Sequence, residues 1–164
     1  NRPVVHYLET GDWRPFDTER TLATAMDVGN PSNMERVRYH WPTVEALREA
    51  VRAERVTDAA IERQIRRGPE VWGEVWAPHT ATAVEARERL AADDRRDWIL
   101  VATAHPAKFE GTVEPLVGQA VPVPEALARV MARAAPAPTV APTLDALREA
   151  VVAHDAARSP AAGA

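Results

Sequence analysis

Apolar residues recur at helical spacing through much of the chain. Ile61 and Ile65 lie four residues apart and share one face of a helix predicted over 58–67, for which Thr57 is a favourable N-cap. The Gly-Pro pair that follows is expected to end this helix. Further helices are predicted over 34–41, 44–53, 78–92, 106–117, 124–135 and 144–157. The pattern therefore predicts a mostly helical chain.

Two segments depart from the helical pattern. Residues 97–103 read Asp-Trp-Ile-Leu-Val-Ala-Thr, an apolar run expected for a central parallel strand covered on both faces. Residues 4–8 form a shorter apolar run that is compatible with a buried strand, although its length does not decide between strand and helix. Between 9 and 32 the sequence is irregular and rich in turn-forming residues, as in long functional loops.

These elements predict an α/β fold with many helices and few strands. A lone buried strand cannot satisfy its own backbone groups, so we expect the sheet to be incomplete in this chain. We divide the sequence into a main domain over 1–135, a proline-rich linker over 136–142, a C-terminal helix over 143–158 and a flexible tail over 159–164. The chain begins with Asn1, and we expect it to be a piece of a larger domain.

Composition excludes several classes of protein and site. The chain has 164 residues, a net charge of −4 and no cysteine, so disulfides, thiolate metal sites and a cysteine nucleophile are excluded. All but one of the 20 basic residues are arginine, and these interleave with glutamate instead of forming a basic stripe. We therefore expect no nucleic-acid partner. No apolar run approaches the roughly 18 residues needed to span a membrane, and we expect a cytoplasmic protein.

Two segments with clustered polar residues precede helices in the first half of the chain. Residues 26–36 contain Asn30, Ser32 and Asn33 just before a predicted helix. They form either a turn with an N-cap or a loop that presents an anion or substrate to the helix N-terminus. Residues 77–81 contain His79 and Thr80. Either Thr80 is a helix cap and His79 has a structural role, or both contact a ligand where a loop enters a helix.

A third polar segment follows the predicted strand. Residues 102–109 carry Thr103, His105 and Lys108 where the strand would end and a helix would begin. Because ligands of open α/β sheets bind outside the carboxyl ends of the strands, we favour a functional role over a capped helix start with a partly solvated lysine. The remaining histidines share no ligand spacing with acidic residues, so a metal site is not supported.

In this order, the three segments resemble threonine synthase of the bacterial and fungal type. The family motifs correspond here to Ala-Met-Asp-Val-Gly-Asn-Pro-Ser-Asn at 25–33, Ala-Pro-His-Thr-Ala at 77–81 and Ala-Thr-Ala-His-Pro-Ala-Lys-Phe at 102–109. The Tyr-Leu-Glu-Thr-Gly-Asp-Trp string at 7–13 resembles the segment that precedes the first motif. The string Thr-Ala-His-Pro-Ala-Lys-Phe is the most specific of these features. The resemblance extends over about residues 1–155.

The resemblance implies the C-terminal portion of an enzyme of the tryptophan-synthase-β fold, fold type II among pyridoxal-phosphate enzymes. Threonine synthase is a lyase of threonine biosynthesis that uses pyridoxal 5'-phosphate to convert O-phosphohomoserine and water to threonine and phosphate. By the resemblance, Thr103 is the hydroxyl residue beside the pyridine nitrogen of the cofactor, and His79 and Thr80 line the cofactor cleft. The implied substrate side consists of Asn30, Ser32, Asn33, His105 and Lys108.

The chain departs from the family pattern in two ways. Ala77 stands where the family has an acidic residue before Pro-His. The Schiff-base lysine and the glycine-rich phosphate loop belong to the N-terminal half, which this sequence lacks, and Lys108 follows the wrong motif to replace that lysine. We therefore expect a fragment whose partner is the missing N-terminal half and which has no activity alone.

Two other functions remain open from the sequence. The chain could derive from another fold type II enzyme, such as a threonine dehydratase or a cysteine synthase relative, although the string at 102–109 disfavours this alternative. It could also be a degenerate, non-catalytic module that pairs with a separate lysine-bearing half.

Overall fold

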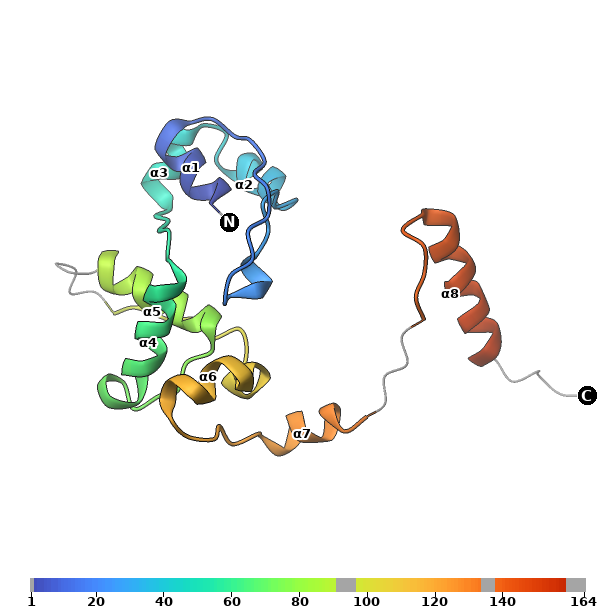
Figure 1. Cartoon of the computed structure of the whole chain (residues 1–164). Helices are drawn as coiled ribbons and strands as arrows, with labels where there is room; N and C mark the ends of the chain where they lie inside the picture. The colour runs from blue at the N-terminus through green and yellow to red at the C-terminus, as the bar shows by residue number, and fades with distance from the viewer. Residues whose placement is uncertain (1, 91–96, 134–137, 159–164) are drawn as a thin grey trace, which may run out of the picture. The chain divides into compact units, whose positions relative to one another are not determined.

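The computed structural model describes residues 2–90, 97–133 and 138–158, and these residues form helices without any β-strand. The chain divides into two compact units, Asn1–Val123 and Pro124–Ala164 (Figure 1). In the first unit the helices are α1 (Pro3–Thr10), η1 (Thr24–Met26), α2 (Met34–His40), α3 (Val44–Ala50), α4 (Asp58–Val71), α5 (Pro78–Leu90), η2 (Pro106–Phe109) and α6 (Glu110–Val117). The second unit contains α7 (Glu125–Met131) and α8 (Leu144–Arg158).

The centre of the first unit is the packing of α4 against α5, with α6 also in contact with α4. Ile61 and Ile65 of α4 are almost fully buried, as are Val84 of α5 and Val113 of α6. Burying an aliphatic side chain of this size contributes roughly 1.5–3 kcal/mol. The helical spacing of the apolar residues on α4 therefore matches the face that forms the core.

A second, smaller cluster lies where α1 packs on α3. Its buried residues are Tyr7, Met34 and Leu47, and the partly buried Trp13 packs against them with its ring edge-on to Tyr7. Arg48 of α3 ties this cluster together, because its guanidinium donates to the Leu8 carbonyl at 2.6 Å and to the Glu9 carbonyl at 3.1 Å. Those carbonyls belong to the last turn of α1, where a cation also interacts favourably with the helix dipole.

The prediction of a buried strand over 97–103 is wrong. This segment has no regular secondary structure, and the side chains of Ile99 and Val101 are 90% and 70% exposed. A strand is stable only when its N–H and C=O groups pair with a neighbouring strand, and the recorded backbone hydrogen bonds of the described residues include none from this segment. The α/β class expected from the sequence is accordingly not confirmed by the described residues.

Two other local predictions are also corrected. The apolar run at 4–8 lies within helix α1, for which Pro3 supplies a favourable first residue. Helix α4 does not end at the Gly-Pro pair but continues through Pro69 to Val71. Beyond the proline the Trp72 N–H donates to the Gly68 carbonyl at 2.9 Å, so the last turn remains hydrogen-bonded. The other helices occur where they were predicted, within a few residues at each end, except that 106–117 divides into η2 and α6 at Phe109.

A buried carboxylate holds α5 against α4. Glu85 is only 5% exposed and accepts hydrogen bonds from Arg63 to both oxygens at 2.8 Å, from Gln64 at 2.7 Å and from Arg89 at 2.9 Å. Burial by itself raises the pKa of Glu85, but the donors from Gln64, Arg89 and Arg63 outweigh it and lower the pKa below its usual value. The stability that this carboxylate contributes is therefore present above the ordinary carboxyl range and is lost as pH falls through the lowered pKa.

Replacing Glu85 by glutamine should lower the free energy of unfolding by about 2 kcal/mol, because an amide nitrogen would face donors that now share a charged acceptor. Glu62→Gln is the control, since the exposed Glu62–Arg66 pair at 3.2 Å should be worth about 0.5 kcal/mol or less. Urea unfolding followed by circular dichroism at pH 7 measures both changes. Equal effects of the two substitutions would contradict the structural role given to Glu85.

Gly68 permits the close approach of the 74–76 segment to α4. A Cβ atom at this position would lie 2.5 Å from the Glu74 carbonyl oxygen and 2.8 Å from Cδ1 of Trp76. We predict that Gly68→Ala lowers the free energy of unfolding by about 1–3 kcal/mol through this overlap. Gly111→Ala on α6 is the matched control: its Cβ would meet nothing within 4 Å, so the substitution should stabilise by about 0.5–1 kcal/mol. Urea midpoints of the two variants should therefore move in opposite directions.

Candidate functional site

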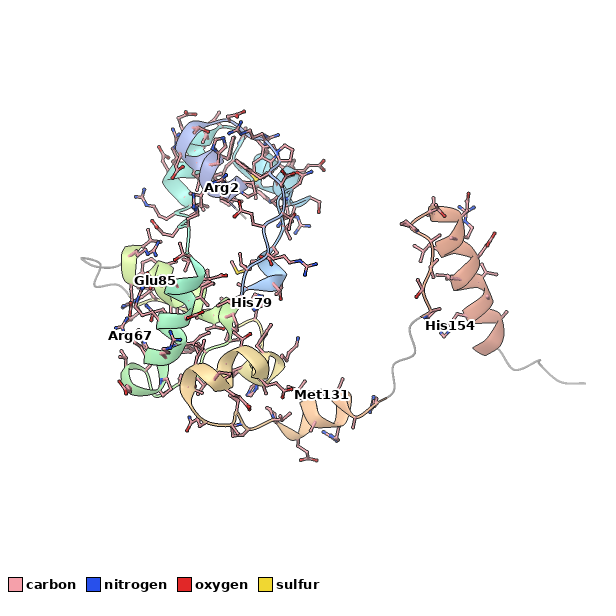
Figure 2. All side chains as sticks on the ribbon, viewed as in Figure 1. Arg2, Arg67, His79, Glu85, Met131 and His154 are labelled. Atoms are coloured by element: carbon pink, nitrogen blue, oxygen red, sulfur yellow. The ribbon has the colours of Figure 1, made fainter. Side chains whose placement is uncertain are left out.

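His79, at the beginning of α5, is the point where the three motif segments meet (Figure 2). Its Nε2 accepts a hydrogen bond from the Ala25 N–H at 3.0 Å, and its ring lies 5.0 Å from the ring of Phe109. The side chain is 8% exposed. Ala25 and Phe109, which lie 54 and 30 positions from His79 in the sequence, therefore converge on one buried imidazole.

The protonation state of His79 follows from these contacts. Because Nε2 is an acceptor, the neutral ring carries its proton on Nδ1, which is buried and has no partner among the described residues. Burial lowers the pKa of His79, Asp27 raises it and Lys108 lowers it, and the net shift is downward. The imidazole is thus neutral near pH 7 and serves as a backbone acceptor.

The turn that reaches His79 is itself fixed by Asp27. Its carboxylate accepts from the N–H of Thr21 at 2.9 Å and from the Thr21 hydroxyl at 2.6 Å. Gly29, two residues later, donates to the Thr18 hydroxyl at 3.2 Å and accepts from the Phe16 N–H at 3.0 Å. The first half of motif 25–33 is consequently a hydrogen-bonded turn that presents the Ala25 N–H to His79.

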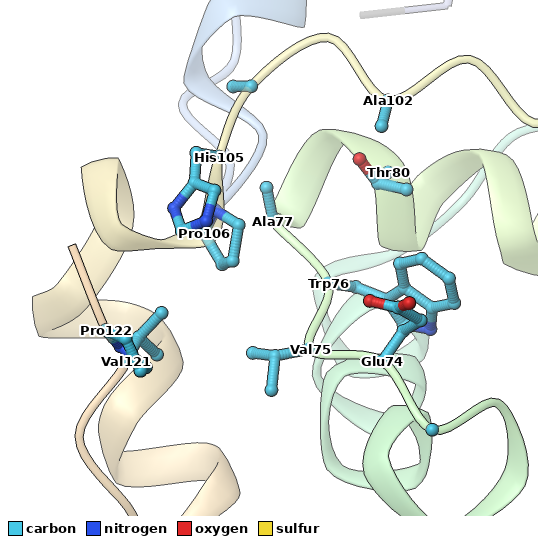
Figure 3. A pocket seen from close by; sticks show the side chains of 12 residues that line it. Glu74, Val75, Trp76, Ala77, Thr80, Ala102, His105, Pro106, Val121 and Pro122 are labelled. Carbon is cyan, nitrogen blue, oxygen red and sulfur yellow. The ribbon is translucent and has the colours of Figure 1, made fainter. Parts of the chain in front are cut away.

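Thr80 faces the largest cavity of those described, of about 580 Å³ (Figure 3). Thr80 is 2% exposed, and its hydroxyl has no hydrogen-bond partner among the described residues. Ala102 and His105 from the third motif line the same cavity, which brings the second and third motifs together. A buried hydroxyl beside such a cavity can accept or donate one hydrogen bond to a ligand, and the volume is within the range of small-molecule pockets.

The other residues proposed from the sequence divide into two groups. Thr103 is exposed and does not line the cavity, although its two neighbours do. His105 caps η2, since its Nδ1 accepts from the Ala107 N–H at 3.2 Å, and Lys108 is exposed at the end of the same turn. Asn30 and Ser32 line a different cavity.

That different cavity lies beside the smaller core cluster. Asn33 is exposed at the N-terminus of α2, and its side chain makes no capping hydrogen bond there. Asn30 and Ser32 share their cavity with Trp13 and Arg38, not with the third motif. The structure therefore joins the beginning of motif 25–33 to His79 and places its end elsewhere.

Sequence reasoning missed two residues of this region. Ala25 contributes only its backbone N–H, which no side-chain pattern reveals. Phe109 was visible as the last residue of the third motif, but its contact with the His79 ring depends on the tertiary arrangement of η2 and α5.

The comparisons with known proteins show what the chain is similar to. Residues 80–151 match the family model described as threonine synthase, C-terminal. Residues 80–151 belong to the threonine synthase C-terminal family. The chain is 36% identical over 135 residues to threonine synthase from Serratia marcescens and 34% identical over 135 residues to that from Escherichia coli K12. These alignments cover 78% of this chain and 29% of each relative, so the chain spans less than a third of the length of the relatives it matches.

Solved structures give the same result for the fold. The crystal structure of threonine synthase from Escherichia coli matches with a TM-score of 0.74 and 29% identity, over 93% of this chain and 35% of that one. A structure titled as PLP-bound threonine synthase from Brucella melitensis matches with a TM-score of 0.68 and 24% identity, over 95% and 38%. The chain is therefore similar in fold to part of these threonine synthases.

The part of the chain that the structure describes contains neither a candidate metal site nor a candidate membrane-spanning helix. No group of three or more histidine, aspartate or glutamate side chains there is arranged to hold a metal ion. None of the helices in this part is both long and apolar enough to cross a membrane.

The lowered pKa of His79 predicts a specific pH dependence of stability. Between the unfolded value near 6.5 and the lowered folded value, the unfolded chain binds more protons, so stability falls as pH is reduced through this interval. His79→Gln keeps an acceptor for the Ala25 N–H but cannot titrate, and should remove this contribution. Urea midpoints at pH 7.5 and pH 5.5 should therefore differ less in His79→Gln than in the unmodified chain.

The control for this experiment is His154→Gln, because His154 is exposed on α8. Its substitution should leave the difference between the two pH values unchanged. If His79→Gln retains the whole difference, the neutral, buried state assigned to His79 is wrong.

Proposed function

We propose that this chain supplies the C-terminal part of the catalytic domain of a threonine synthase, which converts O-phosphohomoserine and water to threonine and phosphate. The observation that carries the proposal is the meeting of the second and third motifs at one cavity, with the buried, unpartnered Thr80 hydroxyl at its edge. The relatives named above are all threonine synthases, which gives no support to a different fold type II enzyme. The same relationship supports a cytoplasmic, soluble enzyme.

Pyridoxal 5'-phosphate is the cofactor that this proposal requires, and the residues present fit part of its binding site. Thr80 offers a buried hydroxyl without a partner, and Thr103 offers an exposed hydroxyl next to two residues that line the cavity. When bound, the cofactor supplies an electron sink for carbanionic character at the substrate. The hydroxyl of Thr103 would accept or donate a hydrogen bond at the pyridine nitrogen without forcing protonation there, as a carboxylate would.

The remaining proposed roles follow from exposure. Lys108 is exposed and can attract an anionic substrate, whereas His105 lines the cavity and its ring is partly committed to capping η2. Asn30, Ser32 and Asn33 stay proposed as substrate-side residues, although they are placed at a separate cavity or on the surface. His79 acts on the site indirectly, by fixing the turn at Ala25 against η2.

The partner in this proposal is the polypeptide that corresponds to the preceding part of the enzyme. The relatives are more than three times as long as the aligned segment, and the Schiff-base lysine would lie in that preceding part. Apart from the half-buried Leu100, segment 98–103 is exposed. It is uncharged and rich in β-forming residues, and its backbone is available for pairing. We propose that this segment becomes a strand when a strand of the partner pairs with it.

The domain division at 135 and 143 likewise stays a proposal.

A chimera tests the function. The C-terminal part of the Escherichia coli enzyme that aligns with this chain is replaced by the chain itself, and phosphate release from O-phosphohomoserine is measured with added pyridoxal phosphate. We predict cofactor-dependent release by the chimera and none by the chain alone. Thr103→Val in the chimera should lower turnover by about 2- to 10-fold, as expected for loss of one neutral hydrogen bond of about 0.5–1.5 kcal/mol.

The controls separate a catalytic effect from a folding defect. Thr112→Val on α6 removes a half-buried hydroxyl away from the cavity and should leave turnover within twofold. An inactive chimera that is folded and binds the cofactor would contradict the proposed function. Equal turnover with and without the Thr103 hydroxyl would contradict only the role given to Thr103.

A further inference from the structure

A third cavity, in a different part of the first unit, is lined by several cationic side chains. Its volume is about 290 Å³, and it is bounded by Arg2, Arg14, Arg55, His6, Phe16 and Glu9. Arg2 is labelled in Figure 2, beside α1. Three guanidinium groups thus face one carboxylate, in a chain whose overall net charge is −4. None of these residues belongs to the site described above.

Two of the guanidinium groups converge on one aromatic ring. The Cζ atom of Arg2 lies 5.1 Å from the centre of the Phe16 ring, and that of Arg14 lies 5.3 Å from it. The ring of His6 meets the same phenyl ring edge-on at 5.2 Å. Both guanidinium groups therefore lie against Phe16 at the cavity, where their positive charges favour a bound anion.

The counter-charges recorded around this cavity are few. Arg14 has one ion pair, with Asp12 at 3.8 Å, and both side chains are more than half exposed. No ion pair is recorded for the side chain of Arg2 or Arg55 within the described part of the chain. By contrast, Arg63, Arg67 and Arg89 each contact a carboxylate at 3.2 Å or less. Arg2 and Arg55 therefore have N–H donors available for an anion, as other exposed arginines of the chain do, but here they line one cavity together with Arg14.

We propose that this cavity binds a phosphate group, either inorganic phosphate or a phosphomonoester. Arginine presents a planar fork of donors that matches phosphate oxygens, and several forks around one small cavity favour a compact dianion over a monocarboxylate. The recessed volume accommodates such a group, with Phe16 as an apolar wall. This proposal is independent of the proposed function, because no residue of the cavity takes part in the site at His79 and Thr80.

Isothermal titration of the full chain with inorganic phosphate at low ionic strength tests the proposal. We expect saturable binding of one phosphate that weakens as potassium chloride is added. Arg55→Gln and Arg2→Gln should each weaken it at least fivefold. Arg36→Gln is the control, since Arg36 is exposed on α2 and lies outside this cavity, and it should weaken binding less than twofold.

Further experiments identify the ligand and detect variants that do not fold. O-phosphoserine replaces inorganic phosphate to test a phosphomonoester, and acetate replaces it to test a carboxylate. Thermal unfolding by circular dichroism checks each variant, and Arg55→Lys and Arg2→Lys, which keep the charge but lose the fork, replace any variant that does not fold. Absence of saturable binding of both phosphate ligands, equal weakening by Arg36→Gln and Arg55→Gln, or acetate binding as tight as phosphate binding would each overturn the proposal.

Discussion

The packing of α5 on α4 is the interaction on which the first unit depends. Apolar burial holds the two helices together, and the Glu85 carboxylate fixes how they are aligned, because it accepts from two residues of α4 and from Arg89 of its own helix. Breaking one member of such a cluster leaves charged donors without an acceptor, which costs more than losing an exposed pair. The position of His79 and Thr80, at the other end of α5, follows from this alignment.

Backbone pairing is the constraint that the first unit leaves unmet. Residues 98–103 have the composition of a strand, yet they are exposed because no strand among the described residues lies beside them. The chain spans less than a third of the length of the curated relatives it matches, and the strand proposed to pair with this segment would belong to the part outside that span. Ala102 of this segment lines the cavity at Thr80, so the segment proposed for strand pairing also contributes to the candidate site.

The helices were predictable from the sequence because their signals are local. Thr43 and Thr57 cap α3 and α4 through their own hydroxyls, and the apolar spacing on α4 identified its buried face. The strand prediction failed because strand formation depends on residues distant in the sequence, which composition does not reveal. The run at 4–8 was ambiguous for the same reason, and Pro3 together with packing on α3 makes it a helix.

The candidate site was only partly predictable, because its motif residues have different kinds of role. The rings of His79 and His105 are engaged by the backbone N–H groups of Ala25 and Ala107, so these histidines shape the turns around the cavity. Both could have been taken for catalytic residues from the sequence alone. By contrast, Thr80 and Thr103 keep hydroxyls that are free in the described structure.

Residues with structural roles and residues proposed to contact ligands occur side by side within one motif. In the string at 102–109, His105 caps the turn and Pro106 begins it, and together they place Ala102 and Ala104 along the cavity wall while Thr103 between them stays exposed. A substitution of His105 would therefore alter the turn and also remove a side chain that lines the cavity. The chemistry proposed for this site depends on threonine hydroxyls, and the histidines determine where those hydroxyls are.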